Sequence, residues 1–317
     1  MEESKLPAVI VTGASGFVGR YLINEFKQDY QVFALARRTQ RESGVPNHEN
    51  IIWVLVDISQ EEKFNKILNE ISEQAQINYI IHLAAYYEFG NQLDDAYEAT
   101  NVLGTHLLLE YAKSLKELKH FIFASSLVAC KYPEPGEYVT ELTPADATYP
   151  YADSKRKGEQ LMYEYSQYFP CATVRFAAVF SDHCEYLPLY FFLKTWLSDR
   201  WDANILAGRG ETALPYIHIN CVISLIRQII KRSKKLSNYE CFLASPDQNA
   251  SHLELFNLAN RYYSGGKKIP LFVPKTLARI AIAVRDLFGR MIGKRPFERL
   301  WMVHYIDKRI DTDSIYT

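Results

Sequence analysis

The chain has 317 residues, of which 48% are hydrophobic and 23% charged, and its formal net charge is −1. These values are typical of a globular protein with a large core, and they exclude a broad basic surface for nucleic acid. Five scattered cysteines, with no Cys-x-x-Cys pair, argue against disulfides or a zinc site and favour a reducing compartment. Because the N-terminus lacks a basic signal segment and no apolar run approaches the ~18 residues of a membrane span, we expect a cytoplasmic protein.

The first motif is a glycine turn between a predicted strand and a predicted helix, Val9-Ile10-Val11-Thr12-Gly13-Ala14-Ser15-Gly16-Phe17-Val18-Gly19. A helix N-terminus after such a turn favours a pyrophosphate, because free N–H groups and the helix dipole attract an anion. We expect Gly13 to allow the tight turn, Gly16 to leave the phosphates room and Gly19 to bring the helix close to the strand. The spacing is not that of the dehydrogenase fingerprint, and an ordinary turn is the alternative.

The next elements alternate between strand and helix. Strands are predicted at 31–36, 51–56, 79–83, 120–124 and 172–180, and helices at 61–74, 93–115 and 151–169. Continuous apolar strands alternating with helices predict an α/β fold with a doubly wound parallel sheet of the Rossmann type. Ligands bind such sheets beyond the carboxyl ends of the strands, where the polar residues of this chain gather.

The alternation ends near residue 180. Beyond it we expect an aromatic-rich stretch at 186–196, a short strand at 216–219 and helices at 222–230, 253–263 and 274–292. We therefore divide the chain into a cofactor-binding part, 1–180, and a smaller substrate-binding part, 181–317, with some elements returning to the sheet. Helix 274–292 is predicted to cover the substrate mouth, with a plain packing helix and a basic membrane-surface helix as alternatives.

A candidate catalytic pair lies on helix 151–169. Tyr151 and Lys155 are four residues apart, so they share one face of the helix. An ammonium ~4 Å from the phenol would lower its pKa by about three units from ~10, into the range where it can act as a general acid or base. Ser126 ends a strand beside the first one, where its hydroxyl could hold a substrate oxygen. Asn101 could keep a backbone carbonyl or a water near the lysine.

The chain resembles the extended short-chain dehydrogenase/reductase family over nearly its whole length. The resemblance rests on these four residues and on Thr12–Gly19, Asp57, 82–85 and 101–105. The resemblance implies that Tyr151 exchanges the proton and that Lys155 lowers its pKa and binds the nicotinamide ribose. It also implies that Ser126 polarises the substrate carbonyl and that Asn101 supports the lysine. The implied cofactor site includes no metal and consists, beside the catalytic pair, of Gly13, Ser15, Gly16, Phe17, Val18, Gly19, Arg37, Arg38, Asp57, Ile58, Leu83, Ala84, Ala85 and Phe176.

The chain departs from the nucleotide-sugar members of that family at its substrate end. Ala178 stands where they carry an asparagine and Leu214 where they carry an arginine, while Leu127 and Val128 replace the Asp-Glu pair of the sugar dehydratases. Burying a diphosphate without paired donors costs several kcal/mol. We therefore predict the hydroxysteroid-dehydrogenase-like or reductase branch, an oxidoreductase acting on an apolar alcohol or ketone. An NAD-dependent sugar epimerase or dehydratase is one alternative, and a non-catalytic nucleotide-binding regulator is another.

The cofactor preference is predicted from the end of the second strand. Ala36 stands where NAD-selective members carry an acidic residue, and the arginines that follow can pair with a 2′-phosphate. We predict NADP in preference to NAD, with Arg37 the better candidate, while solvated arginines and use of either cofactor are the alternative. The assembly is left open, a homodimer included. Residues 311–317 resemble the point where family members begin a last helix, which suits a piece of a longer protein.

Overall fold

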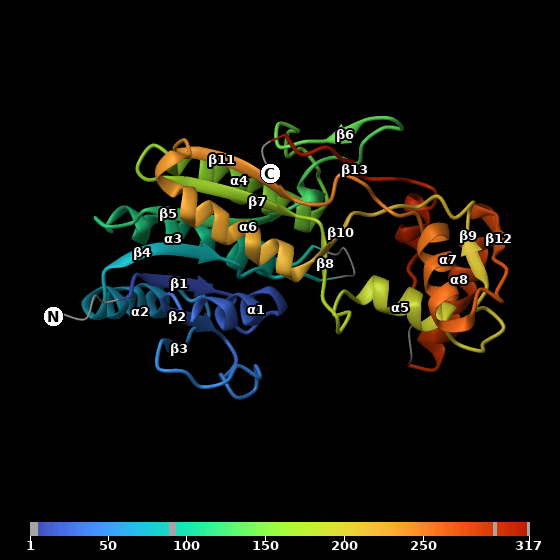
Figure 1. Cartoon of the computed structure of the whole chain (residues 1–317), viewed down its shortest axis with the longest axis horizontal. Coiled ribbons are helices and arrows are strands. Elements are labelled where there is room, and N and C mark those ends of the chain that lie inside the picture. The colour runs from blue at the N-terminus through green and yellow to red at the C-terminus, as the bar shows by residue number, and fades with distance from the viewer. Residues whose placement is uncertain (1–5, 89–92, 294–296, 316–317) are drawn as a thin grey trace.

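The computed structural model describes residues 6–88, 93–293 and 297–315 (Figure 1). Its main sheet has seven parallel strands in the order β3-β2-β1-β4-β5-β7-β11, so the predicted doubly wound α/β fold is confirmed. The strands span β1 (Ala8–Thr12), β2 (Gln31–Ala36), β3 (Ile51–Leu55), β4 (Ile77–His82), β5 (His120–Ser126), β7 (Cys171–Phe176) and β11 (Tyr239–Ala244).

Helices cover both faces of this sheet. Successive side chains of a strand point to opposite faces, so Val9 and Val11 enter one core while Ala8 and Ile10 enter the other. The first core is closed by α1 (Phe17–Phe26) and α6 (Ile219–Arg232). The second is closed by α2 (Glu61–Gln74), α3 (Gly104–Lys113) and α4 (Pro150–Tyr165).

The strand order reverses between β1 and β4. Thr12 and His82 lie opposite each other in the register of this pair, at the carboxyl end of both strands. Connections from the two strands run to opposite sides of the sheet, which opens a crevice where a ligand can bind. The glycine turn follows β1 here, and residues 83–85 follow β4.

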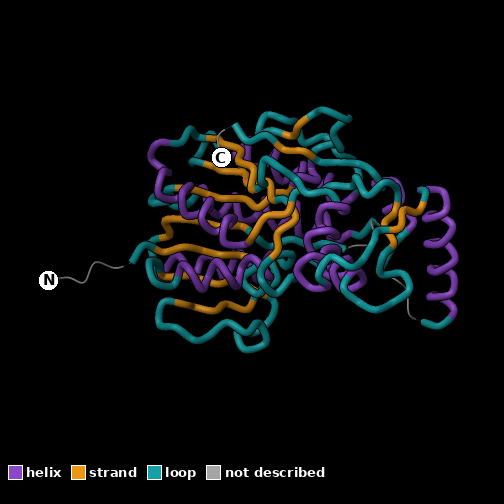
Figure 2. Tube along the Cα trace, turned by 45° about the vertical axis from the view of Figure 1, so that its right-hand side comes forward, coloured by secondary structure: helices purple, strands orange, loops and turns teal. Residues whose placement is uncertain are grey.

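The remaining elements form a smaller region beside the sheet (Figures 1 and 2). Trp196, Leu206 and Phe256 make its buried core. Its helices are α5 (Leu187–Trp196), α7 (His252–Ser264), α8 (Lys275–Met291) and the 3₁₀ turn η4 (Leu300–Tyr305), and its strands are β9 (Ile205–Ala207) and β12 (Leu271–Val273). Two parallel pairs lie between the regions, β8 (Ala178–Phe180) with β10 (Tyr216–His218) and β6 (Tyr138–Val139) with β13 (Asp311–Thr312). Short 3₁₀ turns are η2 (Leu127–Ala129) and η3 (Ser233–Lys235).

Several predicted elements have other bounds or are divided. The predicted strand 172–180 is two strands, because the chain changes partner after Ala177: the N–H of Ala177 still donates to Ala244 O of the main sheet at 2.9 Å, while that of Ala178 donates to Pro215 O at 2.9 Å. The predicted helix 93–115 contains a π-helix, η1 (Tyr97–Leu103), before α3. The helix predicted to reach residue 169 ends at Tyr165. Among the helices in the described ranges, none combines the length and apolar character needed to cross a membrane.

Candidate functional site

The glycine turn after β1 is shaped by close backbone approach. Gly13 has φ +69°, and a Cβ there would lie 2.7 Å from the backbone nitrogen of Ala84. A Cβ on Gly19 would overlap the carbonyl of Gly13. Helix α1 begins after Gly16 with no side-chain cap and no acidic residue in its first turn. Its first N–H groups are therefore available to an anion, so the turn fits a pyrophosphate.

The predicted cofactor residues on β1 and β4 come together at this crevice. Ser15, Phe17 and Val18 lie on the turn and the first helical positions, and the N–H of Ala84 donates to Thr12 Oγ1 at 3.2 Å across the strand ends. Leu83 and Ala85 flank that contact and are half-buried.

Asp57 and Ile58 lie in the connection from β3 to α2. The Asp57 carboxylate accepts from the backbone N–H and the hydroxyl of Ser59, at 3.0 and 2.7 Å. Ile58 is buried against the start of α3, because a Cβ on Gly104 would lie 2.9 Å from its Cδ1. The structure thus gives both residues a local packing role, and their cofactor contacts stay a prediction.

The two arginines after β2 are both exposed but differ in position. The guanidinium of Arg38 donates to the carbonyl of Ser15 on the glycine turn. The backbone carbonyl of Arg38 accepts from Trp53 Nε1 at 3.0 Å. Arg37 makes no hydrogen bond or ion pair within the described ranges. Arg38 is therefore the arginine held beside the anion site, although Arg37 is nearer the strand end.

A chain of buried polar groups runs from the turn toward the helices. His82 is fully buried, with Nδ1 2.6 Å from Thr12 Oγ1 and Nε2 2.8 Å from Thr105 Oγ1. The Thr105 hydroxyl in turn donates to the carbonyl of Asn101 at 2.6 Å. Burial, with Lys155 nearby, lowers the pKa of His82 to about 3, so the ring is neutral at physiological pH and ties these elements together.

Asn101 lies in the π-helix and is buried. Its side-chain oxygen Oδ1 accepts from the N–H of Tyr86 at 2.6 Å, and its side-chain Nδ2 donates to Tyr86 O at 3.0 Å and to Ser154 Oγ at 2.9 Å. The Ser154 hydroxyl donates to the carbonyl of Tyr151 at 2.7 Å. Asn101 thus positions the first turn of α4, which carries Tyr151, and no direct contact with Lys155 is present among the described residues. Bulges of the π type are frequent at functional sites.

Lys155 is held at the end of β5. Its ammonium donates to Ala124 O at 2.8 Å and lies 4.9 Å from the ring centre of Phe123. The ring centre of Tyr151 is 5.9 Å away. Burial lowers the pKa of Lys155 to about 8, while Glu159 opposes that shift.

The predicted lowering of the Tyr151 pKa by Lys155 is wrong for this structure. Burial raises the pKa of Tyr151, and the phenols of Tyr87 and Tyr97 raise it further. The reason is geometric: the ammonium is directed to a backbone carbonyl, while the Tyr151 ring packs edge-on against Tyr87 at 4.8 Å and near Tyr97 at 6.3 Å between centres. Tyr151 is consequently a protonated phenol at neutral pH.

Ser126 ends β5 opposite Phe176 of β7. Its Oγ is 3.5 Å from Phe176 O and accepts from the N–H of Val128 at 3.4 Å, so it is only weakly engaged. The neighbouring hydroxyl of Ser125 donates to Glu159, whose carboxylate pairs with the buried Arg175 through two hydrogen bonds of 2.8 and 3.0 Å. Ser125 thus belongs to a structural ion-pair network, and Ser126 is the hydroxyl left beside the crevice.

Sequence reasoning missed a set of tyrosines beyond Tyr151. Tyr87 contacts Tyr151, and the Tyr186 ring lies 6.0 Å from that of Tyr216. Burial raises the pKa of Tyr186, with a contribution from Tyr87, which places these phenols near one another. The hydroxyls of Tyr132 and Tyr216 are buried without a hydrogen-bond partner among the described atoms. The two consecutive tyrosines after His82–Ala85 and the aromatic-rich stretch 186–196, which begins with Tyr186, were the sequence signals for this set.

The residues that replace sugar-nucleotide anchors are in apolar surroundings. Ala178 begins β8 opposite Tyr216 of β10. Leu214 packs against a small core that includes the buried Leu127. A diphosphate would therefore find no charged side chain at these two positions.

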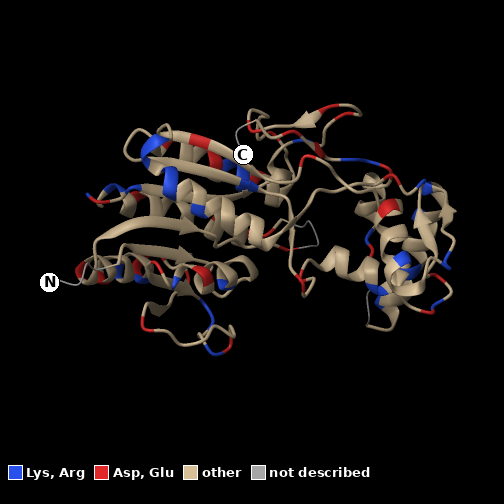
Figure 3. Ribbon diagram, viewed as in Figure 1, with Lys and Arg blue, Asp and Glu red and all other residues tan. Residues whose placement is uncertain are grey.

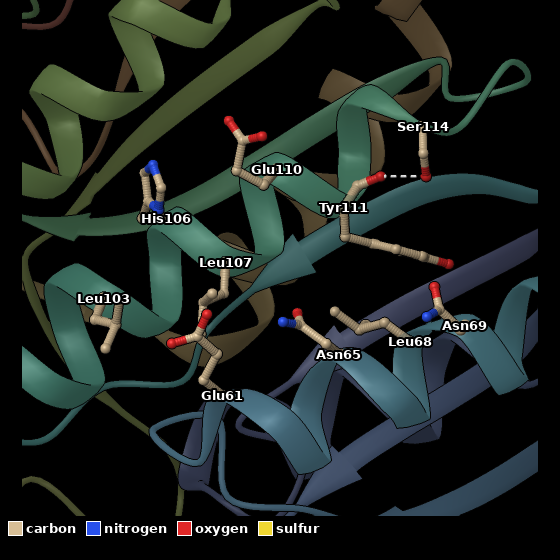
Figure 4. Close-up of a pocket in the computed structure, with 10 residues that line it drawn as sticks. All are labelled: Glu61, Asn65, Leu68, Asn69, Leu103, His106, Leu107, Glu110, Tyr111 and Ser114. Carbon is tan, nitrogen blue, oxygen red and sulfur yellow. Dashed lines mark hydrogen bonds between the residues drawn. The ribbon is translucent and has the colours of Figure 1, made fainter.

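A hollow of about 600 Å³ lies elsewhere, between α2 and α3 (Figure 4). It is lined by polar groups such as Asn65, His106 and Glu110 and by Leu68 and Leu107. None of the predicted site residues lines it, so the candidate site remains the crevice at the carboxyl ends of β1, β4 and β5.

The strand order and the glycine turn define a Rossmann-type dinucleotide-binding fold. Residues 9–242 match the NAD dependent epimerase/dehydratase family, and the chain belongs to this family. Among curated proteins, it is 34% identical over 131 residues to dTDP-D-glucose 4,6-dehydratase of Dictyostelium discoideum, which is 37% of this chain and 28% of that protein. It is 28% identical over 187 residues to the Homo sapiens protein of the same name, 55% of this chain and 52% of that one. The chain therefore spans about half the length of these relatives or less.

Solved structures of similar shape include UDP-glucose 4-epimerase from Thermotoga maritima with UDP-glucose, with a TM-score of 0.69 and 19% identity over 96% of this chain and 89% of that one. Another is UDP-glucuronic acid 4-epimerase from Bacillus cereus with UDP-glucuronic acid and NAD, with a TM-score of 0.68 and 20% identity over 84% and 86%. At these identities the likeness confirms the fold alone. The family match and the curated relatives favour the epimerase/dehydratase alternative over the hydroxysteroid-dehydrogenase-like branch, and they give the NADP preference no support.

Proposed function

We propose that this protein is an NAD-dependent enzyme that oxidises and reduces a hydroxyl-bearing carbon of a nucleotide sugar, with epimerisation as the net reaction. The proposal is supported by the end of β5, where the Lys155 ammonium lies at Ala124 O and Ser126 ends the strand, and by Tyr151 one turn before Lys155 on α4. The family to which the chain belongs and the names of its relatives supply the substrate class.

In this proposal each side chain has a stated part. A bound nicotinamide would supply the hydride acceptor and donor. Tyr151 is protonated at rest, so its phenol must first lose that proton; the phenolate then takes the proton of the substrate alcohol and returns it to the carbonyl oxygen on reduction. Ser126 donates a second hydrogen bond to that oxygen, because its hydroxyl is only weakly held. Lys155 lies at the same strand end and presents further N–H donors to a ribose hydroxyl.

The buried tyrosine hydroxyls support a hydroxyl-rich substrate. A buried hydroxyl without a partner costs free energy, and Tyr132 and Tyr216 each carry one within the described part of the chain. Sugar hydroxyls would satisfy both groups. Epimerisation is preferred to dehydration because Leu127 is buried and Val128 is apolar, so the acid pair that follows the catalytic hydroxyl in sugar dehydratases is missing.

A reductase of an apolar carbonyl compound is the second candidate. Ala178 and Leu214, in apolar surroundings, favour it over a substrate anchored through its diphosphate. Both candidates keep the same roles for the catalytic side chains, and they differ in whether the substrate carries a nucleotide.

The cofactor and the substrate class are tested together. Purified protein is denatured and its released nucleotide identified, and UDP-, dTDP- and GDP-sugars and a set of hydroxysteroids and aldehydes are then offered with NAD or NADPH. Epimer formation from a nucleotide sugar is the expected result. Turnover of an apolar carbonyl compound with net nicotinamide oxidation, and no conversion of any nucleotide sugar, would favour the second candidate.

NAD is the proposed cofactor, and Arg38 decides how well NADP competes. Its guanidinium lies at the Ser15 carbonyl, where it can also meet a 2′-phosphate through charge-assisted hydrogen bonds. Dissociation constants of NADH and NADPH for wild type, Arg38→Ala and the control Arg37→Ala measure this. A loss of NADPH affinity of about tenfold is expected for Arg38→Ala alone. Equal losses in both variants would overturn the assignment to Arg38.

The five cysteines are free thiols, which suits a reducing compartment, and we keep the cytoplasm as the proposed location.

A further inference from the structure

Helix α8 turns its apolar side away from the protein. Six apolar side chains recur every three or four positions and are between 46% and 75% exposed, forming what we call the apolar stripe: Leu277, Ile280, Val284, Leu287, Phe288 and Met291. The positions of α8 that are buried are Ala278, Asp286 and Gly289, on the opposite side of the helix at 100° per residue. Figure 1 shows α8 in the smaller region, at the end of the molecule away from the main sheet. The predicted cover over the substrate mouth, which needs this stripe turned inward, is therefore wrong.

The inward side of α8 explains this orientation. Ala278 and Gly289 are small enough to bring the helix close to its neighbours, and Asp286 accepts two hydrogen-bonding contacts from Arg290, of 2.9 and 2.7 Å. Helix α8 packs in this way against η4, where Lys275 also donates to His304 O at 3.4 Å. An amphipathic helix ordinarily buries its apolar side, so a helix that buries the other side leaves a surface for a partner.

The charge of this segment is unlike that of the rest of the chain. Residues 261–293 contain seven lysines and arginines and one aspartate, a formal charge of +6, in a chain whose total is −1. Arg261, Lys267 and Arg279 make no ion pair in the part of the chain that the structure describes, and all three are exposed. Figure 3 shows blue Lys and Arg positions along the ribbon of the smaller region, with red Asp and Glu positions among them. Tyr262 and Tyr263, each 79% exposed, lie in the same segment.

These features together identify the occupant by its chemistry. An exposed apolar stripe in a basic segment that also carries unpaired cations and exposed aromatic side chains matches a bilayer surface that carries anionic lipid. Helix α8 has 17 residues and carries charges, so it lies on such a surface and does not cross it. A second copy of this chain is the less favourable occupant. If the same segments met, each with a formal charge of +6, charge repulsion would oppose their contact.

We propose that α8 docks this protein onto an anionic lipid bilayer, with the apolar stripe inserted at the headgroup boundary and the basic side chains of 261–293 at the lipid phosphates. The inference is independent of the proposed reaction. It concerns a surface on the smaller region, and the candidate catalytic residues lie at the sheet.

Sedimentation with vesicles tests the proposal. Wild-type protein is expected to bind vesicles of phosphatidylcholine with about one third phosphatidylserine, to bind neutral vesicles at least about tenfold more weakly, and to be released by added salt. The double variant Leu287→Glu/Phe288→Glu is expected to lose about tenfold or more in binding, because each side chain then brings a charge to the boundary. Arg279→Glu is expected to weaken binding to anionic vesicles specifically. Leu142→Glu, at an equally exposed leucine (70%) outside the smaller region, is the matched control.

Because all of these side chains are exposed, the variants are expected to unfold at the temperature of the wild type, which circular dichroism checks. Equal binding to neutral and anionic vesicles would overturn the assignment to anionic lipid, and no vesicle binding would overturn the docking itself. Light scattering covers the other occupant: a wild-type dimer that Leu287→Glu/Phe288→Glu converts to a monomer would mean that the stripe joins two copies of this chain.

Discussion

At the scale of single residues, the roles that we assign in the candidate site depend on which groups the side chains of Lys155 and Arg38 contact. Lys155 lies four residues after Tyr151 on α4, so the two share a helix face, yet the Lys155 ammonium donates to Ala124 O and not to the phenol. Sequence spacing gives the shared helix face but not the direction of a flexible side chain. The same holds for Arg37 and Arg38, where the residue nearer the strand end is the one without a contact to the glycine turn.

Lys155 should make stability depend on alkaline pH. Burial lowers the pKa of this group to about 8 in the folded protein, against ~10.4 when unfolded. Below pH 8 both states are charged, and between these values the unfolded state binds more protons, so folding stability rises with pH by up to about 1.4 kcal/mol per unit. Urea unfolding of wild type and Lys155→Met is measured at neutral pH and near pH ~9.5. The free energy of unfolding of wild type should rise relative to that of Lys155→Met at the higher pH. A difference that does not change with pH would mean that this ammonium is not held in an apolar environment.

At the scale of elements, the parts predicted well are those that local pattern decides. β2 and α2 have the predicted bounds because apolar periodicity and flanking turn residues mark both ends. The predicted strand 172–180 is divided into β7 and β8, since Ala177 still bonds to β11 while Ala178 bonds to Pro215, outside the main sheet. The apolar pattern of the sequence does not distinguish the π-helix η1 from an α-helix. The role of η1 follows from the hydrogen bonds of Asn101 to Tyr86 and Ser154, which only the structure shows.

The link from η1 to α4 should matter for both stability and activity. Asn101→Ala removes the partner of the N–H and of the carbonyl of Tyr86, which costs about 1–3 kcal/mol for each group left unsatisfied, and it also removes the donor to Ser154 Oγ. Ser154→Ala removes the hydroxyl that accepts from Asn101 and donates to the carbonyl of Tyr151, but it leaves both bonds of Asn101 to Tyr86 in place, so its stability loss is expected to be smaller. Urea unfolding of both variants measures this order. A Ser154→Ala protein less stable than Asn101→Ala would show that Asn101 does not carry the link.

At the scale of the whole molecule, the sheet is completed from the second half of the chain. β11 pairs with β7 along its full length, and α6 closes the core over α1, so residues beyond 180 are part of the main sheet. Apolar residues at 239–244 give no signal of which sheet they join, because pairing between distant segments is decided by tertiary contacts. The orientation of α8 was missed for a related reason: periodicity marks an apolar stripe but does not say which side faces the protein.

Buried histidines should make the folded protein sensitive to acid. Burial lowers the pKa of His82 to about 3 and the pKa values of His120 and His252 to about 4. Below pH ~6.5 the unfolded state takes up protons that the folded state does not, so stability is fully present above this pH and falls as the pH drops toward 4. The three groups together contribute a slope of up to about 4 kcal/mol per pH unit. His120→Leu is expected to remove about a third of it in urea titrations between pH ~7 and ~5, and an unchanged slope would contradict the burial of this histidine as the cause.

The central claim is that Tyr151 transfers the proton in a reaction that a bound nicotinamide makes possible. Its direct test is the conversion of nucleotide sugars by wild type, Tyr151→Phe and the control Tyr163→Phe, which alters an exposed tyrosine of the same helix. Epimers are separated by anion-exchange chromatography, and bound NAD is measured in the same samples. We predict at least a hundredfold loss of rate in Tyr151→Phe, about the contribution of a general acid–base, with NAD content unchanged and Tyr163→Phe equal to wild type. A Tyr151→Phe protein that turns over substrate at a rate near that of wild type would contradict the account.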